Sequence, residues 1–208
     1  MIISTIMIIS HKHRFLFVHI QKTAGTSVTE ALGQLEGSLR LGYDHSMVAS
    51  VDAAVYDGYV VFCFVRNPFE RLVSWWNMMM HKGAHNDFSR YLLPRSSSFS
   101  AFLDCTEVVY EENPLERCMD QPYPKSIAFN QLDYITGGDG RLAVNLIGRF
   151  ECLEADFKRV SDAIGVQLVL PHSNAFGRRH YRDYYSPADV EKVRWMCKRD
   201  LDYFGYDF

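Results

Sequence analysis

The sequence lacks the paired cysteine spacings of zinc-binding or disulfide-rich domains. Five cysteines are scattered over 208 residues, and no C-x-x-C pair occurs. A disulfide framework and a thiolate zinc site are therefore not expected, and separate thiols in a reducing compartment are the favoured interpretation. A single bridge, for example between Cys105 and Cys118, stays open at this stage.

Long apolar runs are also missing. The N-terminal segment MIISTIMIIS is apolar but only ten residues long, which is too short to span a bilayer. The basic residues HKHR come after it, whereas a signal peptide places its positive charges first. We interpret the segment as an irregular or strand-like lead-in, and we expect a cytoplasmic protein with no membrane span.

An excess of charge of one sign is absent as well. The formal net charge is -3, so no overall basic field attracts nucleic acid or a membrane surface. Any anion site in this chain must therefore be local. The length and the 48% of hydrophobic residues predict a single domain, 1–208, with a sizeable core.

The sequence does contain an alternation of apolar runs with helical patterns. Strands are predicted at 15–20, 59–65, 143–150 and 166–170, and helices at 25–35, from Pro68 onward, at 153–164 and after Ser186. Strands that alternate with helices predict an α/β fold with a mainly parallel sheet. Residues 81–125 are less regular and are expected to form loops and short helices, as an insertion between core elements.

The helix that begins near Pro68 is predicted to be amphipathic. An apolar stripe is formed by Phe69, Leu72, Trp76 and Met80, and the polar residues are expected elsewhere on the surface: Asn67, Arg71, Ser74 and Asn77.

The segment FLFVHIQKTAGTS leads from a buried strand into a polar loop. The loop N–H groups and the N-terminus of the next helix can bind an anion, and Gly25 permits a close approach of the backbone. Lys22 adds a positive charge, and Thr23, Thr26 and Ser27 add hydroxyl donors. The alternative is a strand-to-helix turn with hydroxyl caps.

The loop does not match the ATP-binding pattern G-x-x-x-x-G-K-[ST]. The lysine precedes the glycine, the first glycine is missing, and Thr26 stands where the lysine belongs. The G-x-G-x-x-G pattern of dinucleotide-binding domains is absent too. Both mismatches weaken a kinase or dehydrogenase interpretation.

A second strand-loop-helix unit, FVRNPFERLVSWW, supplies another anion-binding group. Arg66 directly follows the strand, and Ser74 lies two helical turns after Pro68, so both are expected to face one crevice beyond the strand ends. An arginine fork with a hydroxyl suits a phosphate. Alternatively, Arg66 pairs with Glu70 at the surface. Two such units predict a ligand with two separated phosphates.

Together, HIQKTAGTS and FVRNPFERLVSWW resemble the two nucleotide-binding motifs of the sulfotransferases, which use 3′-phosphoadenosine 5′-phosphosulfate (PAPS) as sulfuryl donor. The pattern is closest to the carbohydrate branch, with its heparan 2-O- and chondroitin-type enzymes, and a soluble, bacterial-type member fits best. Softer matches at 147–157 and at the C-terminus extend the resemblance over nearly the whole chain, except 81–140. It implies a P-loop-NTPase-like three-layer fold, with a central, mainly parallel sheet flanked by helices.

The resemblance also implies roles for individual residues. Arg66 and Ser74 would hold the 3′-phosphate, and a basic loop at 172–185 would fold over the nucleotide, with Arg178 as a further 3′-phosphate contact. The 5′-phosphosulfate would be held by Lys22, Thr23, Ala24, Gly25, Thr26 and Ser27.

Sulfuryl transfer needs a base and a group that stabilises the leaving phosphate. Lys22 suits the second task, and His45 takes the role of the base because it lies as far before the second motif as the catalytic histidine of the heparan 2-O-type enzymes. A loop histidine that caps a helix at 47–55 is the alternative. The reaction inferred in this way needs no metal.

The acceptor is expected to be a hydroxyl of a carbohydrate or small metabolite, with 81–140 on the acceptor side. Two other functions compete with this one: a P-loop kinase that uses ATP, and a nucleotide-binding module without turnover. A kinase would need an aspartate after a strand to position magnesium, and this sequence contains no clear candidate. The inactive module is disfavoured because Lys22 and His45 are both present. The oligomeric state is left open.

Overall fold

The computed structural model describes residues 7–42, 46–83, 87–111, 130–171 and 179–208. These residues belong to two compact units. The first comprises Met1–Arg66 and Gln131–Ala175, and the second comprises Asn67–Asn130 and Phe176–Phe208. Each unit is described by itself below, and the single domain expected over 1–208 stays a prediction.

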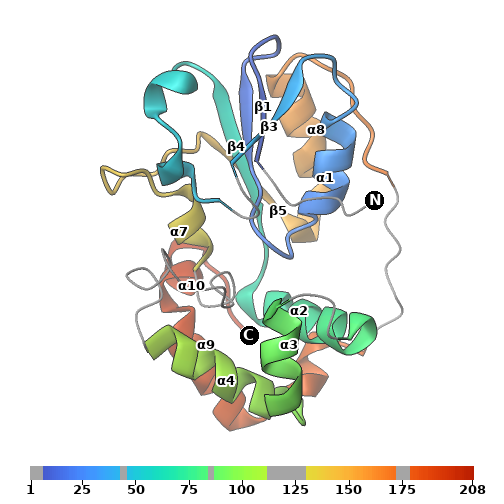
Figure 1. Ribbon diagram of the computed structural model, residues 1–208, viewed down its shortest axis with the longest axis vertical. Coiled ribbons are helices and arrows are strands. Elements are labelled where there is room, and N and C mark those ends of the chain that lie inside the picture. The colour runs from blue at the N-terminus through green and yellow to red at the C-terminus, as the bar shows by residue number, and fades with distance from the viewer. Residues whose placement is uncertain (1–6, 43–45, 84–86, 112–129, 172–178) are drawn as a thin grey trace. The chain divides into compact units, whose positions relative to one another are not determined.

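The first unit is built on a five-stranded sheet with the order β3-β1-β2-β4-β5 (Figure 1). Strand β1 is antiparallel to β2 and β3, whereas β2, β4 and β5 are parallel to one another. Four strands therefore run in one direction, which confirms the mainly parallel sheet. The strands are β1 (Met7–Ser10), β2 (Phe15–Val18), β3 (Ser38–Leu41), β4 (Val60–Val65) and β5 (Leu146–Arg149).

Helices flank this sheet, as predicted. Figure 1 shows α1 and α8 on one side of it, and α7 with two short 3-10 turns on the other. The helices are α1 (Gly25–Leu32), α7 (Gln131–Ile135) and α8 (Leu153–Ala163), and the 3-10 turns are η1 (Val48–Ser50), η2 (Ala53–Val55) and η4 (Phe150–Cys152). The helix expected at 47–55 is thus two separate 3-10 turns.

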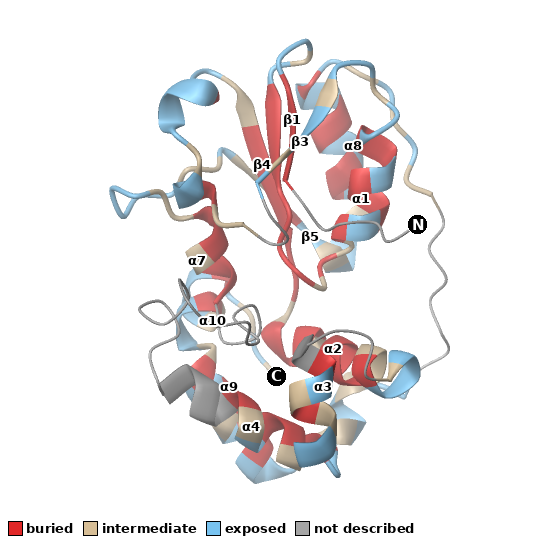
Figure 2. Ribbon diagram, viewed as in Figure 1, coloured by how far each residue is buried: buried red, intermediate tan, exposed pale blue. Residues whose placement is uncertain are grey.

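The core of the first unit forms because β2 and β4 alternate aromatic side chains toward one face. Phe15, Phe17, Phe62 and Phe64 are fully buried and pack in one cluster with Val28 of α1 and other residues of α1 and α8. The rings of Phe17 and Phe62, which are register partners in the parallel pair, lie 5.2 Å apart. Every residue of β1 and β2 is buried, as is β4 after Val60, as expected for strands covered on both faces (Figure 2).

The strand predicted at 166–170 is not formed. The segment has no regular structure, and Val169 is 87% exposed, while Leu168 and Leu170 pack against the cluster under α8. The alternation of apolar residues therefore reflects an extended segment that covers the core without joining a ladder of hydrogen bonds.

The second unit is helical. Its elements are α2 (Pro68–Lys82), α3 (Asp87–Leu92), η3 (Leu93–Arg95), α4 (Phe99–Glu111), η5 (Tyr181–Tyr184), α9 (Pro187–Met196) and α10 (Lys198–Phe204). The single C-terminal helix that the sequence predicted is divided in two at Cys197, where the backbone leaves helical geometry (φ -103°, ψ 18°).

Helix α2 is buried on more sides than its apolar stripe predicts. Helices α4 and α9 and the turn η5 all contact it. As a result Arg71 and Ser74, which were expected on the surface, are buried, while Met80 from the predicted stripe is 54% exposed. The prediction from the amphipathic pattern was that only one face of α2 is covered by other elements, and this prediction is wrong.

Two features of the whole chain complete the description. Among the residues that the structure describes, no helix is both long enough and apolar enough to cross a membrane. Cys63, Cys105, Cys152 and Cys197 are free thiols, as predicted, and Cys118 lies outside the described residues. Burial raises the pKa of Cys63 far above its ordinary value and that of Cys197 to about 12, so neither is a reactive thiolate.

Candidate anion-binding site

The loop after β2 has an unusual backbone. Lys22 and Ala24 adopt left-handed conformations, with φ of 66° and 68°, and Thr23 between them does not. Successive φ angles that alternate in sign turn neighbouring N–H groups toward the same side, which is the geometry of an anion-binding nest. Each non-glycine residue in this region costs about 1–2 kcal/mol, so the strain has to be held in place by the surroundings.

Thr23 holds the loop from inside. Its side chain is fully buried, and its hydroxyl donates a hydrogen bond of 2.8 Å to the carbonyl of Ile20. The hydroxyl therefore closes the loop. Lys22 is half-buried, Ser27 is buried and Thr26 is exposed.

Helix α1 begins at this loop without a cap of its own. Ala24 is the N-cap residue, no side chain caps the first turn, and the first turn carries no acidic residue. The positive end of the helix dipole is thus not neutralised by a carboxylate from its own first turn. Together with the backbone of Lys22 and Ala24, this arrangement favours a bound anion.

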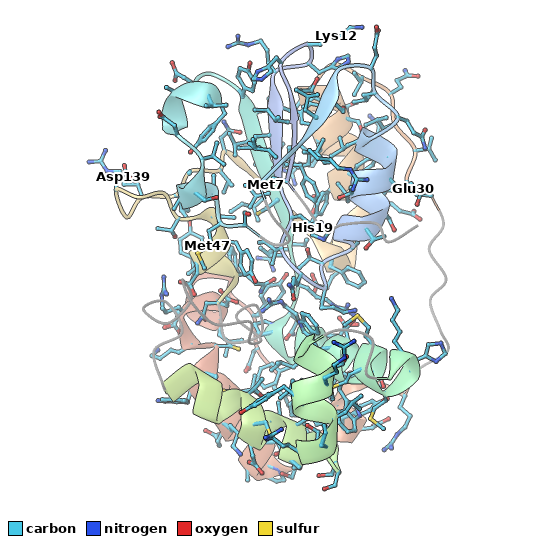
Figure 3. The ribbon with its side chains drawn as sticks, viewed as in Figure 1. Met7, Lys12, His19, Glu30, Met47 and Asp139 are labelled. Atoms are coloured by element: carbon cyan, nitrogen blue, oxygen red, sulfur yellow. The ribbon has the colours of Figure 1, made fainter. Side chains whose placement is uncertain are left out.

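Gly25 is required by a neighbouring side chain. A Cβ atom at this position would lie 1.9 Å from Nε2 of His19, a ring that is itself buried and stacks on Phe17 with centroids 5.7 Å apart. Figure 3 labels His19 beside α1, at the end of β2. The glycine therefore makes room for His19. The contact between His19 and Gly25 was not predicted from the sequence. The occurrence of a histidine and a glycine in one short segment was the signal that could have indicated it.

Arg66 follows β4 and is directly connected to the loop. Its side chain is largely buried, at 6% exposure, and its Nη1 donates to the carbonyl of Lys22 at 3.2 Å. The guanidinium carbon lies 3.8 Å from the ring centroid of Phe150, in a cation–π contact. The backbone of Arg66 is bonded to the side chain of Gln131. Within the first unit, Arg66 of the second sequence motif thus contacts Lys22 of the first.

The other predicted residues are distributed elsewhere. Ser74 is a buried residue of α2 in the second unit, and Arg66 belongs to the first, so each is described within its own unit. His45 and Arg178 lie outside the described residues, and their roles stay predictions. Phe150 and Gln131 were not found from the sequence, because their contacts with Arg66 join distant parts of the chain.

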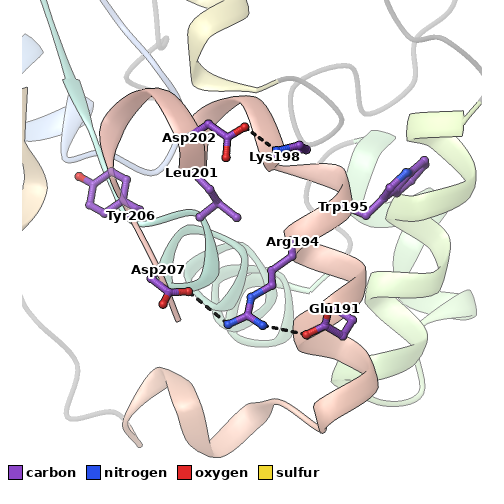
Figure 4. Close-up of a pocket in the computed structure, with 8 residues that line it drawn as sticks. All are labelled: Glu191, Arg194, Trp195, Lys198, Leu201, Asp202, Tyr206 and Asp207. Carbon is purple, nitrogen blue, oxygen red and sulfur yellow. Dashed lines mark hydrogen bonds and ion pairs between the residues drawn. The ribbon is translucent and has the colours of Figure 1, made fainter.

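No metal site is found within the described ranges, since no three His, Cys, Asp or Glu side chains in them gather closely enough to hold an ion. An open depression of about 440 Å³ lies on the second unit (Figure 4). There Arg194 bonds to Glu191 and Asp207, and Lys198 bonds to Asp202. The backbone N–H of Phe208 and the Arg194 guanidinium hold the pKa of Asp207 below its ordinary value. Both basic side chains of the lining are thus paired with acidic ones.

Comparison with known proteins gives one match. A family model described as "Sulfotransferase family" matches residues 6–207, which is almost the entire chain. Searches of curated proteins and of solved structures returned no match.

Proposed function

Since the chain belongs to the sulfotransferase family, we propose that it transfers a sulfuryl group from PAPS to a hydroxyl of a carbohydrate or small-molecule acceptor. The observation that carries the proposal is the strained loop at Lys22 and Ala24, which opens onto an uncapped helix and is bonded to Arg66. The P-loop-like fold of the family places such a loop at the end of a central strand, as β2 does here.

The donor set of the first unit fits a phosphosulfate. The backbone of Lys22, Thr23, Ala24 and Gly25 and the first turn of α1 supply N–H groups, and Lys22 supplies a positive charge. The hydroxyls of Thr26 and Ser27 are further donors in this proposal. Because the Thr23 hydroxyl is bonded to Ile20, Thr23 contributes through its backbone.

The 3′-phosphate is assigned to Arg66, Ser74 and Arg178. A guanidinium has five N–H donors in a planar fork, a geometry that suits a phosphate, and in Arg66 one of them bonds to the carbonyl of Lys22. Its cation–π contact with Phe150 leaves the edge of the planar fork as the side that can meet a phosphate. In this proposal the donor is bound at two points, and both depend on Arg66.

The proposed reaction is an in-line displacement at sulfur. His45 takes the proton of the acceptor hydroxyl as the oxygen–sulfur bond forms. The bond from sulfur to the phosphate oxygen breaks, and its electron pair stays on the 5′-phosphate of the product nucleotide. Lys22 stabilises that developing charge in a largely buried loop, where such a contact is strongest. Residues 81–140 form the acceptor side in this proposal.

The proposal is tested by calorimetric titration with 3′-phosphoadenosine 5′-phosphate (PAP), the product nucleotide, in parallel with ATP and magnesium. We expect PAP to bind more tightly than ATP, and we expect Arg66→Ala to lose most of that affinity. A preference for ATP would contradict the proposal and favour the kinase, and binding of neither nucleotide would also refute it.

His45 is tested separately from nucleotide binding. His45→Ala removes the base and leaves the phosphate contacts intact, so we expect turnover to fall about 100-fold or more while the affinity for PAP changes little. His13→Ala, in the turn before β2, is the matched control and keeps full turnover. Normal sulfate transfer by His45→Ala would show that another group is the base.

A further inference from the structure

Gln131 makes an unusual pair of contacts with the backbone of Arg66. It is the first residue of α7 and its side chain is fully buried, at 0% exposure. Its Oε1 accepts a hydrogen bond from the Arg66 backbone N–H, and its Nε2 donates to the Arg66 carbonyl, each at 2.8 Å. A single side-chain amide thus satisfies both polar groups of one residue.

These contacts extend the sheet by one residue. The parallel pairing of β4 with β5 ends at Val65 and Arg149, so Arg66 is the first residue beyond the ladder. The amide of Gln131 provides there the donor and the acceptor that a peptide group of a neighbouring strand provides inside a sheet. The backbone of Arg66 therefore keeps a defined conformation at a point where the chain leaves the strand.

The head of Arg66 is fixed by different groups. Phe150 contacts the guanidinium face at 3.8 Å, and the carbonyl of Lys22 accepts from Nη1 at 3.2 Å. Both Phe150 and Lys22 belong to the first unit, as do Arg66 and Gln131. An arginine that is held at both ends loses little conformational freedom when it binds a ligand, and this raises the affinity for that ligand.

We propose that Gln131 is a positioning residue which orients Arg66 for the 3′-phosphate of the donor nucleotide. It acts through the backbone of Arg66 and does not contact the nucleotide itself. Gln131 thereby determines how well the protein distinguishes a nucleotide with a 3′-phosphate from one without it. This inference rests on the proposed function.

The test compares the affinities for PAP and for adenosine 5′-monophosphate, which differ in the 3′-phosphate. Both are measured by calorimetry in the intact protein, and the readout is the ratio of the two dissociation constants. Gln131→Met keeps the size of the side chain and removes both hydrogen bonds. We expect the preference for PAP to fall about tenfold or more, the range of one charge-assisted hydrogen bond, with little change for the monophosphate.

A control and a second variant at Gln131 separate a positioning role from a general loss of stability. Asn130→Leu removes the neighbouring buried amide, which bonds to Met196 and Asp200 in the second unit, and we expect it to keep the wild-type ratio. Gln131→Leu also removes both hydrogen bonds without adding a charge, so it provides a second variant if Gln131→Met does not fold. We expect Gln131→Leu to reduce the ratio as well.

A double variant examines the route of the effect. If Gln131 acts through Arg66, Gln131→Met has no further effect on the ratio in a protein that already carries Arg66→Ala. An unchanged ratio in the folded Gln131 variants overturns the inference, as does an equal loss in Asn130→Leu. A wild-type protein that binds both nucleotides alike refutes the proposed function itself, which is a different result.

Discussion

Helices α1 and α2 both follow a buried, parallel strand, but they begin in different ways. Helix α1 starts from Ala24 in a left-handed conformation, without a side-chain cap or an acidic residue in its first turn. Helix α2 has Pro68 in its first turn, Glu70 close by, and Asn67 as a cap whose Oδ1 accepts from the N–H of Phe69 at 3.0 Å. The first helix leaves its positive end open, and the second neutralises it.

The difference indicates two ways to bind a phosphate. At α1 the backbone and the helix dipole are available, so small and strained residues are needed there. At α2 the helix end is occupied, so the proposed phosphate contact comes from the side chain of Arg66, which Gln131 and Phe150 hold. Substitutions at the first turn of one helix should therefore affect one of these two modes of phosphate binding and leave the other unchanged.

The largest effect is expected at Lys22, the charged residue of the open start. Lys22→Ala removes the group that stabilises the leaving phosphate, so we expect turnover to fall by about 100- to 1,000-fold and PAP binding to weaken. Release of PAP from PAPS is the measurement. Lys12→Ala, at an exposed lysine that pairs with Glu36, serves as the control. Wild-type turnover in Lys22→Ala would show that Lys22 does not stabilise the leaving phosphate.

A second prediction concerns the contact of Gly25 with His19. Gly25→Ala forces a Cβ into the buried imidazole, so we expect the free energy of unfolding to fall by about 1–3 kcal/mol in urea titrations. His19→Ala removes the ring. The double variant should therefore be more stable than the sum of the two single changes predicts. Strictly additive effects would mean that Gly25 is needed for another reason.

A third prediction uses α9, which has the most complete cap. Its Asp189 accepts from the Ser186 N–H and hydroxyl and from the Ser100 hydroxyl. Burial tends to raise the pKa of Asp189, but these donors and Lys192 outweigh it and hold the pKa below its ordinary value. The ionised carboxylate therefore stabilises the fold above its unfolded-state pKa, about 3.9, and the stabilisation is lost as the pH falls through the lower folded-state pKa.

Asp189→Asn should accordingly lower the free energy of unfolding at pH 7 by about 1 kcal/mol, the usual range for a cap. The difference from wild type should shrink steadily as the pH is lowered from 4 to 2. Urea titrations across this range are the measurement. A gap that is as large at pH 2 as at pH 7 would contradict a role for the charge.

The smallest effect is expected at Ala24 and has the opposite sign. Ala24→Gly relieves the left-handed strain, so we expect a gain of about 0.5–1 kcal/mol in unfolding free energy, together with weaker PAP binding by a more flexible loop. Ala31→Gly, inside the same helix, is the matched control and should lose about 1 kcal/mol. Equal losses in both variants would show that no strain is stored at Ala24.

The sequence predicted the strands whose apolar side chains are buried on both faces, but it gave no clear assignment for β1. The apolar run before HKHR was interpreted only as an irregular or strand-like lead-in. The β1–β2 connection contains none of the glycine or asparagine residues that usually mark a hairpin, and Arg14 takes the positive φ of 50° instead. A turn built from such residues gives no local signal, so the inner position of β1 emerges only from its pairing.

The candidate site was predictable to a similar extent. The loop at 21–27 and Arg66 are local features that follow apolar strands, and the structure joins them by a hydrogen bond. The contacts of Arg66 with Gln131 and Phe150 depend on how distant segments pack, and no periodicity in the sequence encodes them. The buried state of Arg71 was missed for the same reason.

The order of strands along the chain has a consequence for biosynthesis. Strands β1, β2, β3 and β4 all precede Arg66, whereas β5, Phe150 and Gln131 follow the long segment with α2, α3 and α4. A nascent chain can therefore pair four strands early, and it completes the sheet only after that segment has left the ribosome. Gln131 and Phe150, which hold the backbone and the guanidinium face of Arg66, are synthesised only after that segment, whereas Lys22 is synthesised early. The newly made protein thus acquires its aligned arginine late, after four strands of the sheet and helix α1 have been synthesised.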